Sequence, residues 1–228
     1  MNKKAIWAGA LVSALCFTPL ANAVTVTQCG PSICYEYDNA QVAAATYGQP
    51  TLIGDALRFI PTNFRAQSDD GAGIVNTSAS FYFDRVYTQN PNDNVKKIMI
   101  YEFGDYEITT DGNVSDTLTL DASNNLGAGS ASDTEIFSAI GDSAGLQQWD
   151  IDNTLNVDGS FITSDMNLTV TNVLEANTDA FGESAWIQKK LEIQVVSAIP
   201  LPAAAWFMLS GLGVLAGIAK RRQAAQTA

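Results

Sequence analysis

The side chains of this chain that could carry chemistry are carboxylates, cysteines and aromatic rings, because its 228 residues include no histidine. Histidine is the commonest general base, nucleophile-activating partner and metal ligand. Its absence excludes Ser-His-Asp and Cys-His catalysis and histidine-bound zinc. A carboxylate pair in a deep cleft is the hydrolytic route that remains, but no two of the 24 Asp and Glu residues stand out. We therefore expect no catalytic residues and a protein that is not an enzyme.

Two cysteines close together indicate a disulfide. Cys29 and Cys34 flank a Gly-Pro turn in the stretch QCGPSIC, and the N-terminal segment described below predicts export to an oxidising compartment. A redox-active Cys-x-x-Cys motif needs two intervening residues, whereas four stand here. The pair is predicted to be structural.

Asp-rich turns raise the alternative of bound calcium, which takes six or more oxygen ligands. Asp150 with Asp152, or Asp69 with Asp70, are the first candidates. No turn follows EF-hand spacing, and Asp-Gly is equally typical of a plain turn. We expect no metal site and no cofactor, with calcium as the alternative.

Exposed aromatic rings could stack on sugars. Trp186 occupies the polar positions of its predicted strand and is the best candidate for such a glycan platform, whereas Trp149 falls on the apolar face of its strand and is predicted to be core. Further candidates are Tyr82, Tyr101 and Tyr106.

The charge distribution argues against nucleic acid as a partner. Five of the 12 Lys and Arg residues lie near the chain ends, so residues 24–198 carry seven basic against all 24 acidic residues, a net charge of −17. Phosphate backbones need Lys and Arg.

The elements between residues 24 and 198 are predicted to be β-strands. Residues 166–171 alternate strictly between apolar and polar, as do 149–157 and 187–195. Further strands are expected at 78–87, 96–103 and 116–120, and one short helix at 133–142 with Asp133 as its cap. Asp111-Gly112 has the composition of a hairpin turn. The predicted fold is all-β: one antiparallel, jelly-roll-like β-sandwich ectodomain spanning residues 24–198.

The N-terminal 23 residues have the parts of a secretory signal peptide: Lys3 and Lys4, an apolar run, and small residues at Ala21 and Ala23. Signal peptidase is expected to cut after Ala23.

The C-terminal segment is predicted to cross a membrane once. Residues 203–219 carry no charge and are long enough, at about 1.5 Å per residue, to span about 26 Å of hydrocarbon. Lys220, Arg221 and Arg222 follow as a basic stop-transfer cluster, and the positive-inside rule puts the tail 220–228 in the cytoplasm and the body outside.

The stretch before this helix resembles a known sorting signal. Ile199, Pro200, Leu201, Pro202 and Ala203, followed by an apolar helix and a basic cluster, are similar to the VPLPA variant of the PEP-CTERM signals. Leu201 stands where the parent motif has Glu. The resemblance covers residues 199–228 and implies an exosortase that cuts near the motif at the inner membrane, in an exopolysaccharide-producing bacterium.

The function expected from the sequence is therefore that of an exported, non-enzymatic surface or extracellular-matrix protein, associated with the envelope, exopolysaccharide or biofilm. Its expected partners are signal peptidase, exosortase, the inner membrane and exopolysaccharide, and its final location is the cell surface or the medium. The alternative is a carbohydrate-binding β-sandwich module, which would bind its glycan with or without calcium.

Overall fold

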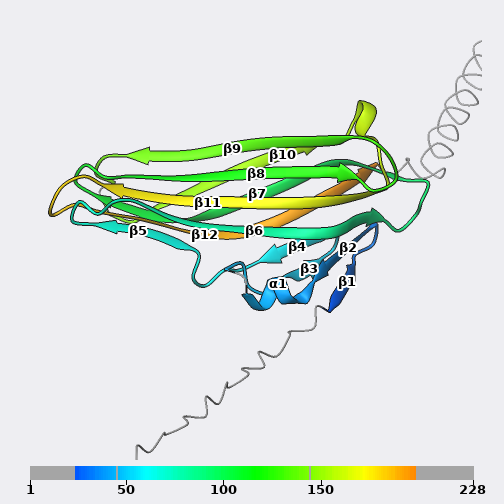
Figure 1. Cartoon of the computed structure of the whole chain (residues 1–228), viewed down its shortest axis with the longest axis horizontal. Coiled ribbons are helices and arrows are strands. Elements are labelled where there is room, and N and C mark those ends of the chain that lie inside the picture. Colours follow the sequence, from blue (N-terminus) through cyan, green and yellow to red (C-terminus); the bar gives the residue numbers. More distant parts are fainter. Residues whose placement is uncertain (1–23, 45, 144, 199–228) are drawn as a thin grey trace, which may run out of the picture.

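The computed structural model describes residues 24–44, 46–143 and 145–198, which form two antiparallel β-sheets packed face to face (Figure 1). Sheet A has the strand order β1-β2-β6-β11-β8-β9 and sheet B the order β10-β7-β12-β4-β3, with β5 also paired to β12. The strands of sheet A are β1 (Thr25–Cys29), β2 (Ile33–Asp38), β6 (Gly73–Thr88), β8 (Asn113–Asn124), β9 (Ser130–Ile140) and β11 (Asp165–Thr178). Those of sheet B are β3 (Thr51–Ile53), β4 (Ala56–Phe59), β5 (Arg65–Asp69), β7 (Asn94–Thr109), β10 (Gln147–Asn156) and β12 (Ser184–Ala198). The all-β, antiparallel sandwich is the fold class that the alternating sequence pattern predicted.

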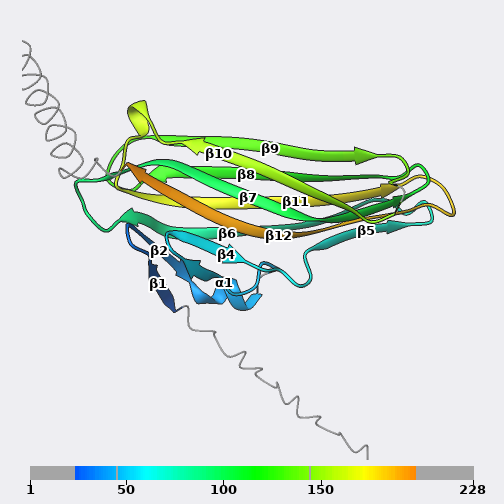
Figure 2. The same cartoon turned by 180° about the vertical axis from the view of Figure 1, so that it is seen from behind.

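Long strands give the sandwich its elongated outline, which Figure 2 shows from behind. The chain changes sheet at most connections: β5, β7, β10 and β12 lie in sheet B, whereas β6, β8, β9 and β11 lie in sheet A. The short strands β1 to β4 extend the two sheets on one side, together with the helix α1 (Asn39–Ala44). A single 3-10 turn, η1 (Gly159–Phe161), precedes β11.

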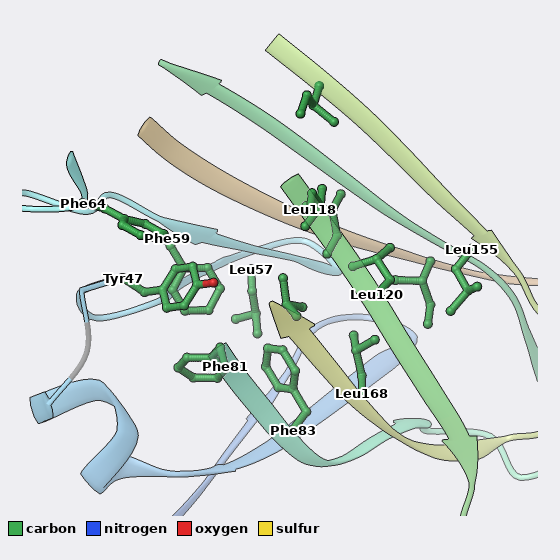
Figure 3. Close-up of a cluster of buried hydrophobic side chains, with 14 of the residues drawn as sticks. Tyr47, Leu57, Phe59, Phe64, Phe81, Phe83, Leu118, Leu120, Leu155 and Leu168 are labelled. Atoms are coloured by element: carbon green, nitrogen blue, oxygen red, sulfur yellow. The ribbon is translucent and has the colours of Figure 1, made fainter. Parts of the chain in front are cut away.

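Aromatic rings fill the core between the sheets near β4 and β6 (Figure 3). Phe81 lies at the centre, with its ring centroid 5.0 Å from that of Phe59, 4.9 Å from Phe83, 5.4 Å from Tyr37 and 6.0 Å from Tyr47. Most of these pairs meet edge to face, an arrangement that adds to the free energy of area burial. This packing joins β2, β4 and β6 across both sheets.

The helix predicted at residues 133–142 is wrong. These residues belong largely to β9, the edge strand of sheet A, which pairs along its length with β8. The spacing of Ile136, Phe137 and Ile140 suits a helix face, but the strand lets Phe137 stack on Trp149 with ring centroids 5.5 Å apart. Tertiary packing has overridden a weak local preference.

The hairpin predicted at Asp111-Gly112 is also wrong. The turn does join two strands, but β7 lies in sheet B and β8 in sheet A, so the strands that flank it do not pair with each other. Thr110, with φ 71°, turns the chain between the layers.

Candidate functional site

Several predicted site residues lie outside the described part of the chain. These are the signal cleavage residues Ala21 and Ala23, the sorting motif Ile199–Ala203, and the basic cluster Lys220, Arg221 and Arg222. Among the residues described, no helix has both the length and the apolarity needed to cross a membrane.

The predicted disulfide is confirmed. Cys29 and Cys34 are bonded and lie opposite each other at the end of the β1–β2 hairpin. Asp55 fixes the connecting turn, because its Oδ1 accepts hydrogen bonds from the backbone N–H groups of Ser32 (2.8 Å) and Ile33 (3.0 Å). A Cβ on Gly30 would come within 2.1 Å of the carbonyl oxygen of Gly54, so only glycine fits there. These contacts make the cysteine loop a structural element.

Trp186 lies on the outer face of sheet B, but its ring does not stand alone. The guanidinium carbon of Arg65 sits 4.2 Å from the ring centroid, and the indole N–H donates to Oε2 of Glu107 at 3.3 Å. One face of the predicted platform is thus occupied by a cation.

A second aromatic site on the same face is formed by Tyr101 and Phe103 of β7. Their ring centroids are 5.9 Å apart, with the ring planes inclined by 34°, and Tyr101 is 42% exposed. They lie together on the outer face, since residues two apart on a strand share a face. Of the tyrosines predicted as alternatives, Tyr82 is exposed on sheet A, whereas Tyr106 packs on Phe137 at 5.5 Å.

Polar side chains of β10 border the Tyr101–Phe103 pair. Asp152 lies opposite Tyr101 in the strand register, and Asp150 lies opposite Phe103. Partial desolvation raises the pKa of the Tyr101 hydroxyl, and the charges of Asp150 and Asp152 raise it further. A depression of about 140 Å³ lies beside the pair. Its lining residues are Tyr101, Phe103, Gly104, Gln148, Trp149 and Asp150. We call Tyr101, Phe103, Gln148, Asp150 and Asp152 the aromatic–acidic patch.

Trp149 lies beneath this patch with its ring in the core, as predicted, and is only 2% exposed. Its indole N–H donates to the carbonyl oxygen of Gln188 at 3.1 Å, which ties β10 to β12 across β7. Gly104 of β7 allows this close approach, because a Cβ there would come within 1.8 Å of the same carbonyl oxygen.

The two aspartate pairs considered for calcium differ in their surroundings. Asp69 accepts hydrogen bonds from Gln67 and Ser184, and Asp70 accepts one from the backbone N–H of Gly182 at 3.0 Å, so both serve the β5–β6 turn. Asp150 and Asp152 are exposed on β10. Within the described residues, no three His, Cys, Asp or Glu side chains come together as a metal ion would require.

A buried charged cluster was missed by the sequence analysis. Glu102 of β7, Asp116 of β8 and Lys189 of β12 meet between the sheets, with no exposed side-chain surface. Two buried amides, Asn153 and Asn172, also lie in the interior. Their positions could have revealed all five residues. Each stands in the row of every second residue that is otherwise apolar in its strand; Asp116, for example, precedes Leu118 and Leu120 in that row.

Comparisons with known proteins assign no family. No protein-family model matches the chain, and no curated protein matches it either. Among solved structures, the chain is similar to TmCBM61, described in complex with beta-1,4-galactotriose, at 15% identity over 56% of this chain and 86% of that one. The TM-score is 0.18, and a likeness of this size carries no argument about function.

Proposed function

We propose that this is an exported, non-enzymatic surface or extracellular-matrix protein that is sorted by an exosortase. Signal peptidase would cut after Ala23, the helix 203–219 would hold the chain in the inner membrane, and exosortase would cut near Ile199–Ala203. The order of motif, apolar segment and basic cluster at residues 199–228 supports this proposal. We also propose that the eight strands β5 to β12 form a jelly roll; their order, β10-β7-β12-β5 over β9-β8-β11-β6, supports this.

We further propose that the sandwich holds polysaccharide on the aromatic–acidic patch. The observation that carries this function is the Tyr101–Phe103 pair, in which Tyr101 is exposed and Phe103 half-buried, beside carboxylate and amide side chains. Aromatic faces offer sugar rings an apolar surface, and flanking polar groups accept or donate the hydrogen bonds that orient them.

The acidity of the patch favours a neutral glycan. Asp150 and Asp152 lie within it, Asp105 and Glu107 continue along β7, and the whole body carries −17. An anionic polysaccharide would be repelled by this field. The lining of the depression contains one carboxylate, Asp150, which suits binding better than hydrolysis, since hydrolysis needs two carboxyl groups placed across a bound sugar.

Affinity electrophoresis in gels containing a neutral β-glucan, a neutral galactan or alginate tests the glycan proposal. Tyr101→Ala and Phe103→Ala should each weaken retardation by a neutral glycan about tenfold, the loss expected when a central aromatic contact is truncated. Tyr82→Ala, on the opposite sheet, is the matched control and should bind as the wild type does. Equal loss in all three variants, or retardation by alginate alone, would contradict the proposal.

Mass analysis of the protein from its native cells tests the sorting proposal separately. A C-terminus between Ile199 and Ala203 is expected. A chain that ends at Ala228 in the inner membrane would show that the segment is a plain anchor.

A further inference from the structure

The buried cluster of Lys189, Glu102 and Asp116 joins the two sheets at the middle of the sandwich. Nζ of Lys189 lies 3.3 Å from Oε2 of Glu102 and 3.7 Å from Oδ1 of Asp116. Its third neighbour is an aromatic face, with Nζ 4.4 Å from the ring centroid of Phe64. An amine, a carboxyl carbon and a second carboxyl group are therefore within reach of each other in the buried core.

The polar atoms of this cluster are poorly satisfied. Within the described residues, both carboxyl oxygens of Asp116 and Oε1 of Glu102 lack a hydrogen-bond partner. Burial raises the pKa of Glu102 well above its usual range; the Lys189 charge opposes this rise, and the neighbouring Asp116 adds to it. The Lys189 amine thus faces two carboxyl groups in a place where ions cost several kcal/mol each to desolvate.

We propose that this cluster is a cross-linking site, at which Lys189 Nζ and the Asp116 carboxyl carbon condense to an intramolecular amide bond with Glu102 as the proton-transfer group. No cofactor or oxidant is required, since the reaction is a dehydration.

The step balances within the three side chains. A proton passes from the Lys189 ammonium to the Asp116 carboxylate by way of Glu102, which leaves a neutral amine and a neutral carboxylic acid. The nitrogen lone pair attacks the Asp116 carboxyl carbon, and Glu102 takes a proton from nitrogen while it gives its own to the departing hydroxyl. One C–N bond forms, one C–O bond breaks, one water is released, and Glu102 ends protonated as it began.

Two properties of the site favour a bond that lysine and aspartate do not form in water. Fixing the reactants in one site gives effective concentrations of about 10⁵ to 10⁸ M. Replacing a poorly solvated ion pair by a neutral amide also removes a desolvation penalty from the folded state. The product would link β8 of sheet A to β12 of sheet B.

Peptide mapping of the full-length protein, reduced and denatured, tests the proposal. Lys97 and Lys189 are consecutive tryptic sites, so an unlinked chain yields the peptide 98–189. The bond would block cleavage after Lys189, and the peptide would extend to Lys190 and be lighter by one water. A second digestion at glutamates should leave the segment with Asp116 covalently joined to that with Lys189.

An unlinked peptide 98–189 of full mass would overturn the proposal. So would a water loss that maps to Asp111-Gly112 or Asp158-Gly159, where aspartate can close on its own backbone to a succinimide. This measurement needs no variant, so it does not depend on whether a mutant folds.

Substitutions assign the roles of the residues. Glu102→Gln keeps the shape of the side chain but cannot relay protons. Its tryptic peptide should therefore lose no water and have the full mass of the unlinked chain. Lys189→Met should also stay unlinked, whereas Lys96→Met, at an exposed lysine of β7, should form the link as the wild type does. A Glu102→Gln chain that is still fully linked would remove Glu102 from the mechanism.

Discussion

Glu102 is buried beside Asp116, with Lys189 as the only cation in contact with the two carboxyl groups among the described residues. Because burial holds the pKa of Glu102 above its value in the unfolded chain, proton binding and folding are linked. A raised folded-state pKa gives stability that is fully present below the unfolded pKa, near 4.5, and is lost as the pH rises through the folded pKa.

A pair of variants isolates this linkage. Lys189→Met and Lys189→Met/Glu102→Gln both lack the amine, so no amide can form in either. Relative to the double variant, Lys189→Met should lose stability as the pH rises above about 4.5 and until it passes the raised pKa of Glu102, by up to about 1.4 kcal/mol per pH unit. Denaturant unfolding at several pH values measures the difference. A difference that stays constant with pH would mean that Glu102 does not titrate in the core.

The polar core residues also mark where residue-level prediction fails. The alternation that placed Trp149 in the core and Trp186 on the surface would place Glu102, Asp116 and Lys189 in the core as well. Burying a charge is costly unless it is paired. The charge pairs join strands far apart in sequence, so no local pattern shows which residues pair. The acidic border of the Tyr101–Phe103 pair was hidden for the same reason, since the β7–β10 register creates it.

At the scale of elements, strands were predictable where one face is buried and apolar and the other is exposed and polar. β6, β7, β8, β10, β11 and β12 were all anticipated at least partly, because buried and exposed residues alternate along them. The edge strand β9 was not, since it leaves Ile136 and Ile140 exposed and so blurs its own period. Pairing partners were not predictable either, as the Asp111-Gly112 crossover between sheets illustrates.

The β1–β2 hairpin is the element whose stability depends on one covalent bond. Its cysteines are five positions apart, and closing so short a loop stabilises by at most about 2 kcal/mol. Cys29→Ala/Cys34→Ala should cost no more than this and should act locally. Hydrogen exchange should quicken in residues 25–29 and remain unchanged in β8. A uniform rise in both would show that the bond stabilises the whole sandwich.

At the scale of the whole molecule, β12 closes the fold. It pairs with β7 from Ser184 to Ala198 and, on its other side, with β4 and β5. Without β12, sheet B consists of the pair β10–β7, the pair β3–β4 and the single strand β5. The last described strand joins them, which gives the fold many contacts between distant residues.

Truncation tests this dependence. A chain that ends after Phe181 lacks β12 and should show no cooperative unfolding transition, whereas a chain that ends at Ala198 should unfold like the full-length protein. Thermal unfolding followed by circular dichroism distinguishes them. A cooperative transition in the shorter chain would mean that the sheets close without β12.

The same position of β12 decides how the molecule bears mechanical load. Tension applied beyond Ala198 runs along β12, which pairs with β7 from Ser184 to Ala198 and with β4 and β5 over residues 184–188 and 191–194. Its hydrogen bonds are therefore loaded together, in shear. Tension applied before Thr25 meets β1, an edge strand of sheet A. The hydrogen bonds between β1 and β2 can break one after another. We therefore expect a pull on the C-terminal side of the sandwich to need more force than a pull on its N-terminal side.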